Sequence, residues 1–138
     1  MRNLPFLVFI ACAILTTTTA ADVQHGTPQE LVSTEYYKHY FKSGDSYIAG
    51  QPSETAIRRL RQQGITAVVN LRTPEEMMDR EQVPFDEAAL VKSIGLDYTQ
   101  IPMNGNKAYP EIFLDKFIAT DDDHNGKILL HCRSAKRA

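Results

Sequence analysis

The sequence predicts an α/β fold with a parallel central sheet flanked by helices. Short apolar runs rich in β-branched residues alternate with amphipathic segments along most of the chain. Two of those segments end at Gly64 and Gly95, and glycine is the residue that most often follows the end of a helix. Strands that alternate with helices at this spacing are typical of a parallel sheet, so a single α/β domain accounts for the pattern.

A polar segment, residues 21–46, precedes the first predicted strand and carries several aromatic side chains. Spacings of three and four residues place part of this aromatic set on one face of a predicted helix. The set comprises Tyr36, Tyr37, Tyr40 and Phe41. We interpret these side chains as core packing, because aromatic residues at helical spacing pack against a core far more often than they bind a ligand.

The first half of the domain is predicted as strand, helix and strand. Residues 47–49 form a short strand, and Ser53 can cap the helix that follows it and stops at Gly64. Residues 65–71 are a β-branched run, which is typical of a buried strand. Residues 73–76 then open a polar loop.

The second half of the domain repeats this order. Residues 85–94 have helical spacing, residues 96–101 are predicted as a strand, and residues 102–107 as a loop. Proline at the first helical position starts a helix over residues 110–120. Its predicted apolar face consists of Ile112, Phe113, Phe117 and Ile118. Residues 127–131 are the last strand, and ligands of such sheets bind beyond the carboxyl ends of the strands.

The composition is that of an ordinary globular protein and offers little attraction to polyanions. Of the 138 residues, 43% are hydrophobic and 23% are charged, which suffices for one domain with its own core. The net charge of −2 gives no electrostatic reason to expect a nucleic acid or an anionic membrane as partner. We therefore expect no nucleic-acid partner, and we expect neither a metal nor a cofactor.

Residues 1–20 have the pattern of a cleavable secretory signal peptide. A basic residue precedes an apolar stretch over residues 4–15, and small residues up to Ala20 form a cleavage site. The apolar stretch is too short for a stable membrane span, so the pattern predicts a secreted or periplasmic protein. Cleavage of the signal peptide would remove Cys12 and leave Cys132 as the only cysteine, so the mature chain could not form an internal disulfide.

The residues that carry chemistry follow the last predicted strand. Cys132 comes directly after the apolar run, with His131 before it and a short basic loop after it. The loop consists of Arg133, Ser134, Ala135, Lys136 and Arg137. Nearby cations and converging backbone N–H groups stabilise a thiolate and lower the pKa of its thiol. The same N–H groups form a nest for an oxyanion, and Arg137 can bind two of its oxygens at once. This pattern is typical of chemistry on a phosphate-like or sulfur-carrying group.

Two plainer interpretations of the same residues stay open at this point. A cysteine after an apolar strand is often a small buried hydrophobic residue. Residues 133–137 also fit a solvated basic tail. Clustered cations repel one another unless an anion offsets them, however, and this favours a reactive, anion-binding cysteine.

Several short motifs, taken in order, resemble the cysteine phosphatase superfamily. The matching pieces are Tyr47-Ile48-Ala49-Gly50-Gln51-Pro52, Val68-Val69-Asn70-Leu71-Arg72 with Glu75 or Glu76, Ile101-Pro102, and His131-Cys132 with Arg137. Within the superfamily the chain is most similar to the bacterial beta-lactamase-hydrolase-like phosphatases. The resemblance covers about residues 45–138 and implies a phosphatase-like α/β domain over residues 47–138.

This resemblance implies a phosphohydrolase that acts on a phosphorylated small molecule or protein. Cys132 would attack phosphorus to form a phosphocysteine, which water then hydrolyses. Arg137 would hold the phosphoryl oxygens as charge spreads over them. His131 would help to keep Cys132 ionised, and Arg72 would have a structural role near the loop. Substrate contacts would come from the backbone of Arg133, Ser134, Ala135 and Lys136.

Three features depart from the pattern of the superfamily. Four residues separate Cys132 from Arg137, where most cysteine phosphatases have five. Ala135 stands where these families have glycine, which predicts a strained or altered loop because alanine resists positive φ. The predicted loop over residues 102–107 offers no carboxylate to protonate the leaving group, and Glu111 is the nearest, so the general acid is unassigned.

The end of the sequence is a further departure. In this family a helix follows the arginine and directs its N-terminal dipole at the anion. The sequence stops at Ala138, before such a helix. We therefore expect a fragment or truncated product of a phosphatase-like protein, C-terminally incomplete and lacking the C-terminal helices.

Three other functions fit parts of the sequence. A rhodanese-like sulfurtransferase would carry a persulfide on Cys132 in the same cationic loop. Residues 121–126 match the start of a calcium-binding loop, although its twelfth position is Cys132 instead of glutamate, which favours a plain polar turn. A catalytically inactive module that binds phosphorylated ligands is the third alternative.

Overall fold

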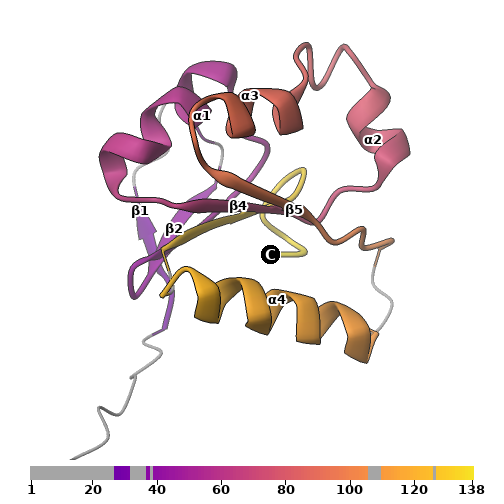
Figure 1. The fold of residues 1–138 in the computed structure, drawn as a ribbon. Helices are drawn as coiled ribbons and strands as arrows, with labels where there is room; N and C mark the ends of the chain where they lie inside the picture. The colour runs from indigo at the N-terminus through magenta and orange to yellow at the C-terminus, as the bar shows by residue number, and fades with distance from the viewer. Residues whose placement is uncertain (1–26, 32–36, 38, 106–109, 126) are drawn as a thin grey trace, which may run out of the picture.

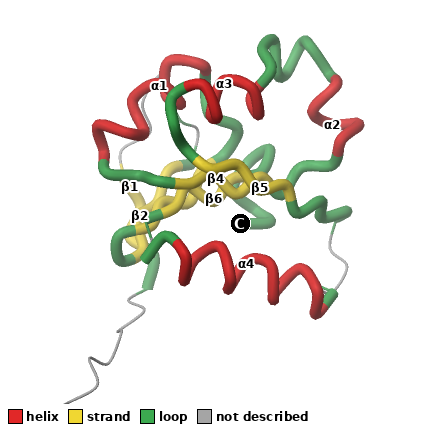
Figure 2. Tube along the Cα trace, in the orientation of Figure 1, coloured by secondary structure: helices red, strands yellow, loops and turns green. Residues whose placement is uncertain are grey.

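The computed structural model of the chain describes residues 27–31, 37, 39–105, 110–125 and 127–138 and centres on a six-stranded sheet (Figure 1). Across the sheet the strands follow the order β1-β2-β3-β6-β4-β5. The strands are β1 (Gln29–Leu31), β2 (Tyr40–Ser43), β3 (Ser46–Ala49), β4 (Ala67–Asn70), β5 (Asp97–Gln100) and β6 (Ile128–His131). Helices lie on both faces of this sheet, so the predicted α/β class is confirmed (Figure 2).

Four of the six strands are parallel, as predicted. Both β3 and β4 pair with β6, and β5 pairs with β4. The pairing aligns the last residues of these strands, Ala49, His131, Asn70 and Gln100, in one row. The segments that leave the carboxyl ends of the parallel strands therefore lie side by side along one edge of the sheet.

The first two strands are antiparallel and come from the segment before the predicted domain. β1 pairs with β2, and β2 pairs with β3. The helix predicted from the aromatic spacing is wrong for the described residues, because Tyr40 and Phe41 lie in β2. The ring of Tyr40 stacks on Tyr37 and on Tyr47, with centroid separations of 4.4 and 5.1 Å. Stacked aromatic pairs of this kind stabilise a sheet, so tertiary packing overrides the helical spacing. Tyr36 lies outside the described residues.

Helix α1 (Glu54–Leu60) begins where the sequence predicts. The Ser53 side chain accepts a hydrogen bond from the backbone N–H of Ala56 at 3.1 Å. A short 3-10 helix, η1 (Arg61–Gln63), continues α1 and ends at Gly64, whose φ is 81°. A left-handed residue of this kind suits glycine, which explains the sharp stop.

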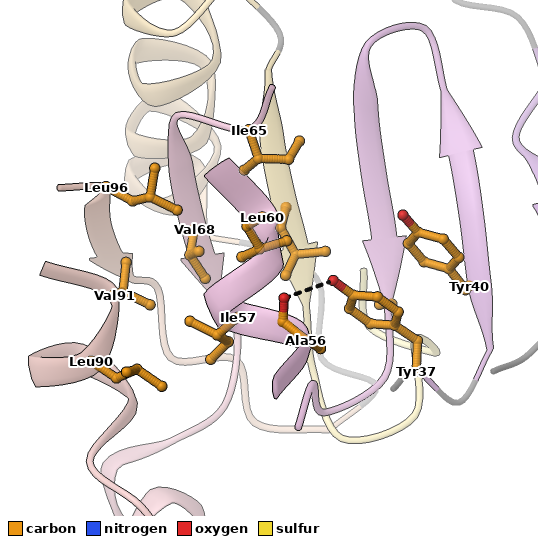
Figure 3. Packing of buried hydrophobic residues seen from close by; sticks show 12 residues of the cluster. Tyr37, Tyr40, Ala56, Ile57, Leu60, Ile65, Val68, Leu90, Val91 and Leu96 are labelled. Carbon is orange, nitrogen blue, oxygen red and sulfur yellow. Dashed lines mark hydrogen bonds between the residues drawn. The ribbon is translucent and has the colours of Figure 1, made fainter. Parts of the chain in front are cut away.

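Helices α1 and α3 (Glu87–Ser93) lie on the same face of the sheet, above it in Figure 1. Their buried side chains and those of the strands form one apolar core, which Figure 3 shows from close by. This core includes Ile57, Leu60, Val68, Leu90, Val91 and Leu129. Burying a side chain of this size contributes about 1.5–3 kcal/mol, so burial on this face stabilises the fold.

Helix α4 (Glu111–Asp123) covers the opposite face, below the sheet in Figure 1. The predicted apolar face is only half correct. Phe113 and Phe117 pack against a second apolar cluster on the underside of the sheet. Ile112 and Ile118, in contrast, are 65% and 54% exposed.

The segment after β4 is helical where the sequence predicts a loop. Helix α2 (Pro74–Met78) starts with a capping box, in which Thr73 and Glu76 exchange side-chain and backbone hydrogen bonds. Proline at the first helical position supports the same start. The helix is only five residues long, too short for a periodic apolar pattern to reveal it.

Two findings concern membranes and export. None of the helices in the described ranges is long and apolar enough to cross a membrane. The predicted signal peptide, residues 1–20, lies outside the described residues. Export therefore stays a prediction.

Candidate active site

The alternation of side chains along β6 decides where the key residues face. Leu129 belongs to the core beneath α1 and α3, whereas Ile128 and Leu130 pack on the side of α4. His131 therefore faces α3, and Cys132 faces the α4 side, where it lies in the second apolar cluster. Cys132 is 1% exposed, and its backbone N–H donates to the Ala49 carbonyl at 3.3 Å.

The loop after β6 closes on the cysteine sulfur. The backbone N–H of Arg137 donates to Sγ of Cys132 at 3.4 Å, so the two ends of the loop meet. The carbonyl of Arg133 accepts from the backbone N–H of Gln51 at 3.2 Å, and Ser134 bridges to Gly50. These contacts fix the loop against the segment that follows β3.

Ala135 has a φ of 60°, in the left-handed region. The strain predicted for this position is therefore present in the structure. A left-handed conformation costs a non-glycine residue roughly 1–2 kcal/mol.

Arg137 is anchored at its far end by two other segments. Its Nη1 and Nη2 atoms donate to the two carboxylate oxygens of Glu76 at 2.9 and 2.7 Å. Nη1 also donates to the Met103 carbonyl at 2.7 Å. The hydrogen bonds to Glu76 raise the pKa of Arg137, and attraction and hydrogen bonding to Cys132 raise it further.

His131 is paired with a glutamate that the sequence analysis did not identify. Nε2 of His131 lies 2.8 Å from Oε1 of Glu87, and both side chains are fully buried. Burial opposes ionisation of Glu87, but His131, a hydrogen bond from Gln51 and the charge of Arg72 outweigh it and lower the pKa of this carboxyl. Glu87 is therefore a carboxylate inside the protein.

Arg72 connects the two ion pairs. It is completely buried; its Nη1 donates to Oε1 of Gln51 at 2.6 Å and its Nη2 to the Glu76 carbonyl at 3.1 Å. Its Nε lies 3.9 Å from the Glu76 carboxylate and has no hydrogen-bond partner among the described residues. Burial lowers the pKa of Arg72, and repulsion from Arg137 and Arg133 adds to the effect. The Glu76 carboxylate thus lies between the guanidinium groups of Arg72 and Arg137.

The structure brings together only some of the predicted site residues. Cys132, His131 and Arg137 are held by the contacts above. Ser134 and Ala135 are half-buried in the loop. The side chains of Arg133 and Lys136 are exposed, and neither forms an ion pair with another described residue.

Glu87 carried no signal in the sequence that would have singled it out. It occupies the first position of α3, directly after the capping residue Asp86, where an acidic side chain is ordinary and exposed. Its burial depends on α3 packing over the ends of β4 and β6. The motif around Asn70 and Arg72, which the family resemblance quoted, does mark the same network.

Two recesses flank the loop. One, of about 550 Å³, adjoins Arg133 and mixes polar with apolar walls. Its lining includes Tyr37, Gln51, Pro52, Ser53, Gln82 and Phe85. The other, of about 190 Å³, is an apolar groove between α4 and the sheet that reaches Arg137. A larger recess of about 680 Å³, near Ser43 and Asp121, includes no residue of the loop and has no evident part in its chemistry.

The calcium-loop alternative is wrong for the residues that the structure describes. Asp121, Asp122 and Asp123 belong to the last turn of α4 instead of a loop. Within the described ranges, no group of three or more acidic, histidine or cysteine side chains could hold a metal ion. Gly126, the turn residue of that pattern, lies outside them.

The chain was compared with protein families, with curated proteins and with solved structures, and the solved structures gave the matches. No family model matches the sequence. No curated protein matches it either. Solved structures, however, match with high probability.

Three of these structures illustrate the likeness. A candidate phosphatase (DUF442) from Shewanella putrefaciens CN-32 is 27% identical, with a TM-score of 0.61 over 74% of this chain and 63% of that one. The core catalytic domain of the PP-IP phosphatase SIW14 from S. cerevisiae, in complex with citrate, is 22% identical, with a TM-score of 0.50 over 80% and 60%. A cysteine-to-serine variant of P. aeruginosa TpbA in complex with pTyr is 12% identical, with a TM-score of 0.56 over 85% and 63%.

The chain thus shares the fold of these phosphatase structures. The chain spans slightly less than two thirds of the length of these structures.

Proposed function

We propose that this chain is a cysteine-dependent phosphohydrolase that acts on phosphomonoesters. One observation carries the proposal. The loop over residues 132–137 closes on the sulfur of Cys132, while Glu76 and Met103 fix the Arg137 guanidinium at the other end of the same loop. A thiol, a fixed guanidinium and a ring of backbone N–H groups are the parts that phosphoryl transfer to sulfur requires. The 27% identical candidate phosphatase supports this assignment.

The proposed reaction has two steps at Cys132. The thiolate attacks phosphorus in line, so that an S–P bond forms and the P–O ester bond breaks. The leaving alcohol or phenol carries away the electron pair of that bond and takes up a proton. Water then breaks the S–P bond, which releases inorganic phosphate and restores the thiol. Arg137 and the loop N–H groups stabilise the equatorial oxygens in both steps.

The proton for the leaving group has no evident donor among the described residues near the loop. Residues 102–105 contain no carboxylate, and residues 106–109, which lie outside the description, read Asn-Lys-Ala-Tyr. Glu76 is engaged with Arg137, whose hydrogen bonds lower the pKa of that carboxyl and so disfavour the protonated form. We therefore expect fast hydrolysis only for esters whose leaving group needs little protonation, such as nitrophenyl phosphate.

The test is a direct assay of two chemistries on the same protein. Release of nitrophenol from nitrophenyl phosphate by the wild-type chain, and its loss in Cys132→Ser, would support the phosphatase. Thiocyanate formation from thiosulfate and cyanide, with no nitrophenol release, would instead identify a sulfurtransferase. Tight tungstate binding with neither activity would identify an inactive phosphate-binding module.

Export to the periplasm or the exterior is part of the proposal. It rests on the signal pattern of residues 1–20 alone. Expression of the full chain followed by mass measurement of the product tests it. A mature chain that begins near residue 21 supports export, and an uncleaved cytoplasmic product contradicts it.

A further inference from the structure

The buried polar groups behind the cysteine form one continuous chain of contacts. Arg72 donates to Oε1 of Gln51 at 2.6 Å, and Nε2 of Gln51 donates to Oε2 of Glu87 at 2.5 Å. Oε1 of Glu87 then contacts Nε2 of His131 at 2.8 Å and accepts from Asn70 at 3.2 Å. The segments involved follow β3 and β4, begin α3 and end β6, so the chain crosses the whole active edge of the sheet.

The hydrogen-bonding capacities of Arg72 and Glu87 fix the orientation of the Gln51 amide that lies between them. A guanidinium only donates and a carboxylate only accepts, so the Gln51 amide must turn its oxygen to Arg72 and its nitrogen to Glu87. Both oxygens of Glu87 are then occupied by donors. Nε2 of His131 must carry a proton to complete the set.

This arrangement controls the residue that immediately precedes the nucleophile. His131 is completely buried, and its Nδ1 has no hydrogen-bond partner among the described residues. Glu87 accepts from Nε2, so it sets which ring nitrogen carries the proton and how the ring lies, one residue before Cys132.

We propose that Glu87 is a positioning residue for Cys132: its buried carboxylate, oriented by Gln51 and Arg72, fixes the Nε2 proton and the orientation of His131, the residue before the nucleophile. The inference rests on the proposed function in that Cys132 is the nucleophile. It adds a residue that lies in none of the quoted family motifs and that acts only through His131.

A pair of variants separates this role from a merely structural one. Glu87→Gln removes the charge and leaves a clash, because its new amide nitrogen faces the donor nitrogen of Gln51. The double variant Gln51→Glu with Glu87→Gln repairs that clash. In this double variant the carboxylate at position 51 accepts hydrogen bonds from Arg72 and from the side-chain nitrogen of the glutamine at position 87. The side-chain oxygen of that glutamine still accepts from His131 and Asn70. Only the 3.4 Å contact from Gln51 to the Pro52 carbonyl is lost.

The measurements are melting temperature and the rate at which iodoacetamide alkylates Cys132 at neutral pH, with hydrolysis of nitrophenyl phosphate alongside. Alkylation needs the thiolate but no phosphatase activity, so failure of this inference and failure of the proposed function are distinguishable. Glu30→Gln is the matched control, because Glu30 is an exposed residue of β1, far across the sheet from β6.

We expect Glu87→Gln to lower both the melting temperature and the alkylation rate, the latter roughly tenfold. The double variant should recover the melting temperature but not the alkylation rate or kcat, because its carboxylate no longer touches His131. Recovery of alkylation together with stability would overturn the proposal, as would a wild-type rate in Glu87→Gln. The double variant decides the question even where Glu87→Gln alone does not fold.

Discussion

The two ends of the loop over residues 132–137 are held in different ways. At the cysteine end, His131 and Glu87 are fully buried, and the neighbouring backbone continues a central strand. At the arginine end, Arg137 and Glu76 keep 16% and 29% of their side chains exposed, and their contact joins a short helix to a loop. The comparison indicates a rigid half that carries the nucleophile and a more accessible half that binds the anion, where solvent and ligand can compete with Glu76.

Removal of the sulfur should have the largest effect on activity and little effect on binding. Cys132→Ser replaces the nucleophile but leaves the loop N–H groups and Arg137 in place. We expect no measurable turnover of nitrophenyl phosphate and retained tungstate affinity by calorimetry. Substantial turnover by this variant would refute the phosphocysteine mechanism.

Removal of the guanidinium should damage both properties. Arg137→Ala deletes the group that binds two phosphoryl oxygens, and loss of one such contact typically costs about 10²–10³ in kcat. Tungstate binding should weaken in parallel, which distinguishes this end of the loop from the cysteine end. Unchanged tungstate affinity in Arg137→Ala would mean that the arginine is not part of the anion site.

Stability should show the opposite asymmetry. Glu87→Ala leaves the buried His131 and Asn70 side chains, and that of Gln51, without the carboxylate that they contact, and breaking a buried pair costs about 3–5 kcal/mol. Glu76→Ala breaks a partly exposed pair with Arg137, and it also removes half of the capping box of α2 and the carboxylate nearest to Arg72, so it should cost about 2 kcal/mol. Urea unfolding of both variants measures the difference, and equal losses would contradict the division into a rigid and an accessible half.

Acid should weaken the fold through the same carboxylates. The pKa values of Glu87 and Glu76 both lie below the ordinary value of 4.5 in the folded protein. Their contribution to stability is therefore complete above about pH 4.5 and is lost as pH falls through the lower folded values. Urea unfolding as a function of pH should show this decline, with a shallower slope in Glu87→Gln. Equal slopes in the two proteins would show that Glu87 is not ionised in the folded state.

The smallest predicted effect is a gain. Ala135→Gly removes the cost of holding an alanine in the left-handed conformation. Glycine loses more chain entropy on folding, which cancels part of this gain. The net effect should stabilise the protein by about 0.5–1 kcal/mol. Thermal unfolding measures this change. A lower melting temperature would mean that the loop does not adopt a φ near 60° in solution.

The sequence predicts those parts of the fold that local rules decide. The Ser53 cap, the stop at Gly64 and the four parallel strands each follow from a few neighbouring residues. The predicted helix around Tyr40 was wrong because stacking with residues distant in sequence favours a strand. Helix α2 was missed because five residues are too few to show a period.

The candidate site divides in the same way. Cys132, His131 and Arg137 are adjacent in sequence, so their pattern is visible without a structure. Glu87 reaches His131 from 44 residues away, and Glu76 reaches Arg137 from 61. Both contacts exist only because helices α2 and α3 pack over the carboxyl ends of the strands. No local pattern could have assigned these two partners.

The most direct test of the account is to trap the covalent intermediate. The wild-type chain is mixed with nitrophenyl phosphate, quenched in acid within the first turnover, digested and examined by mass spectrometry. The account predicts a peptide that carries one phosphoryl group on Cys132 and is absent from Cys132→Ser. Turnover of the substrate by a chain whose Cys132 is never phosphorylated would contradict it.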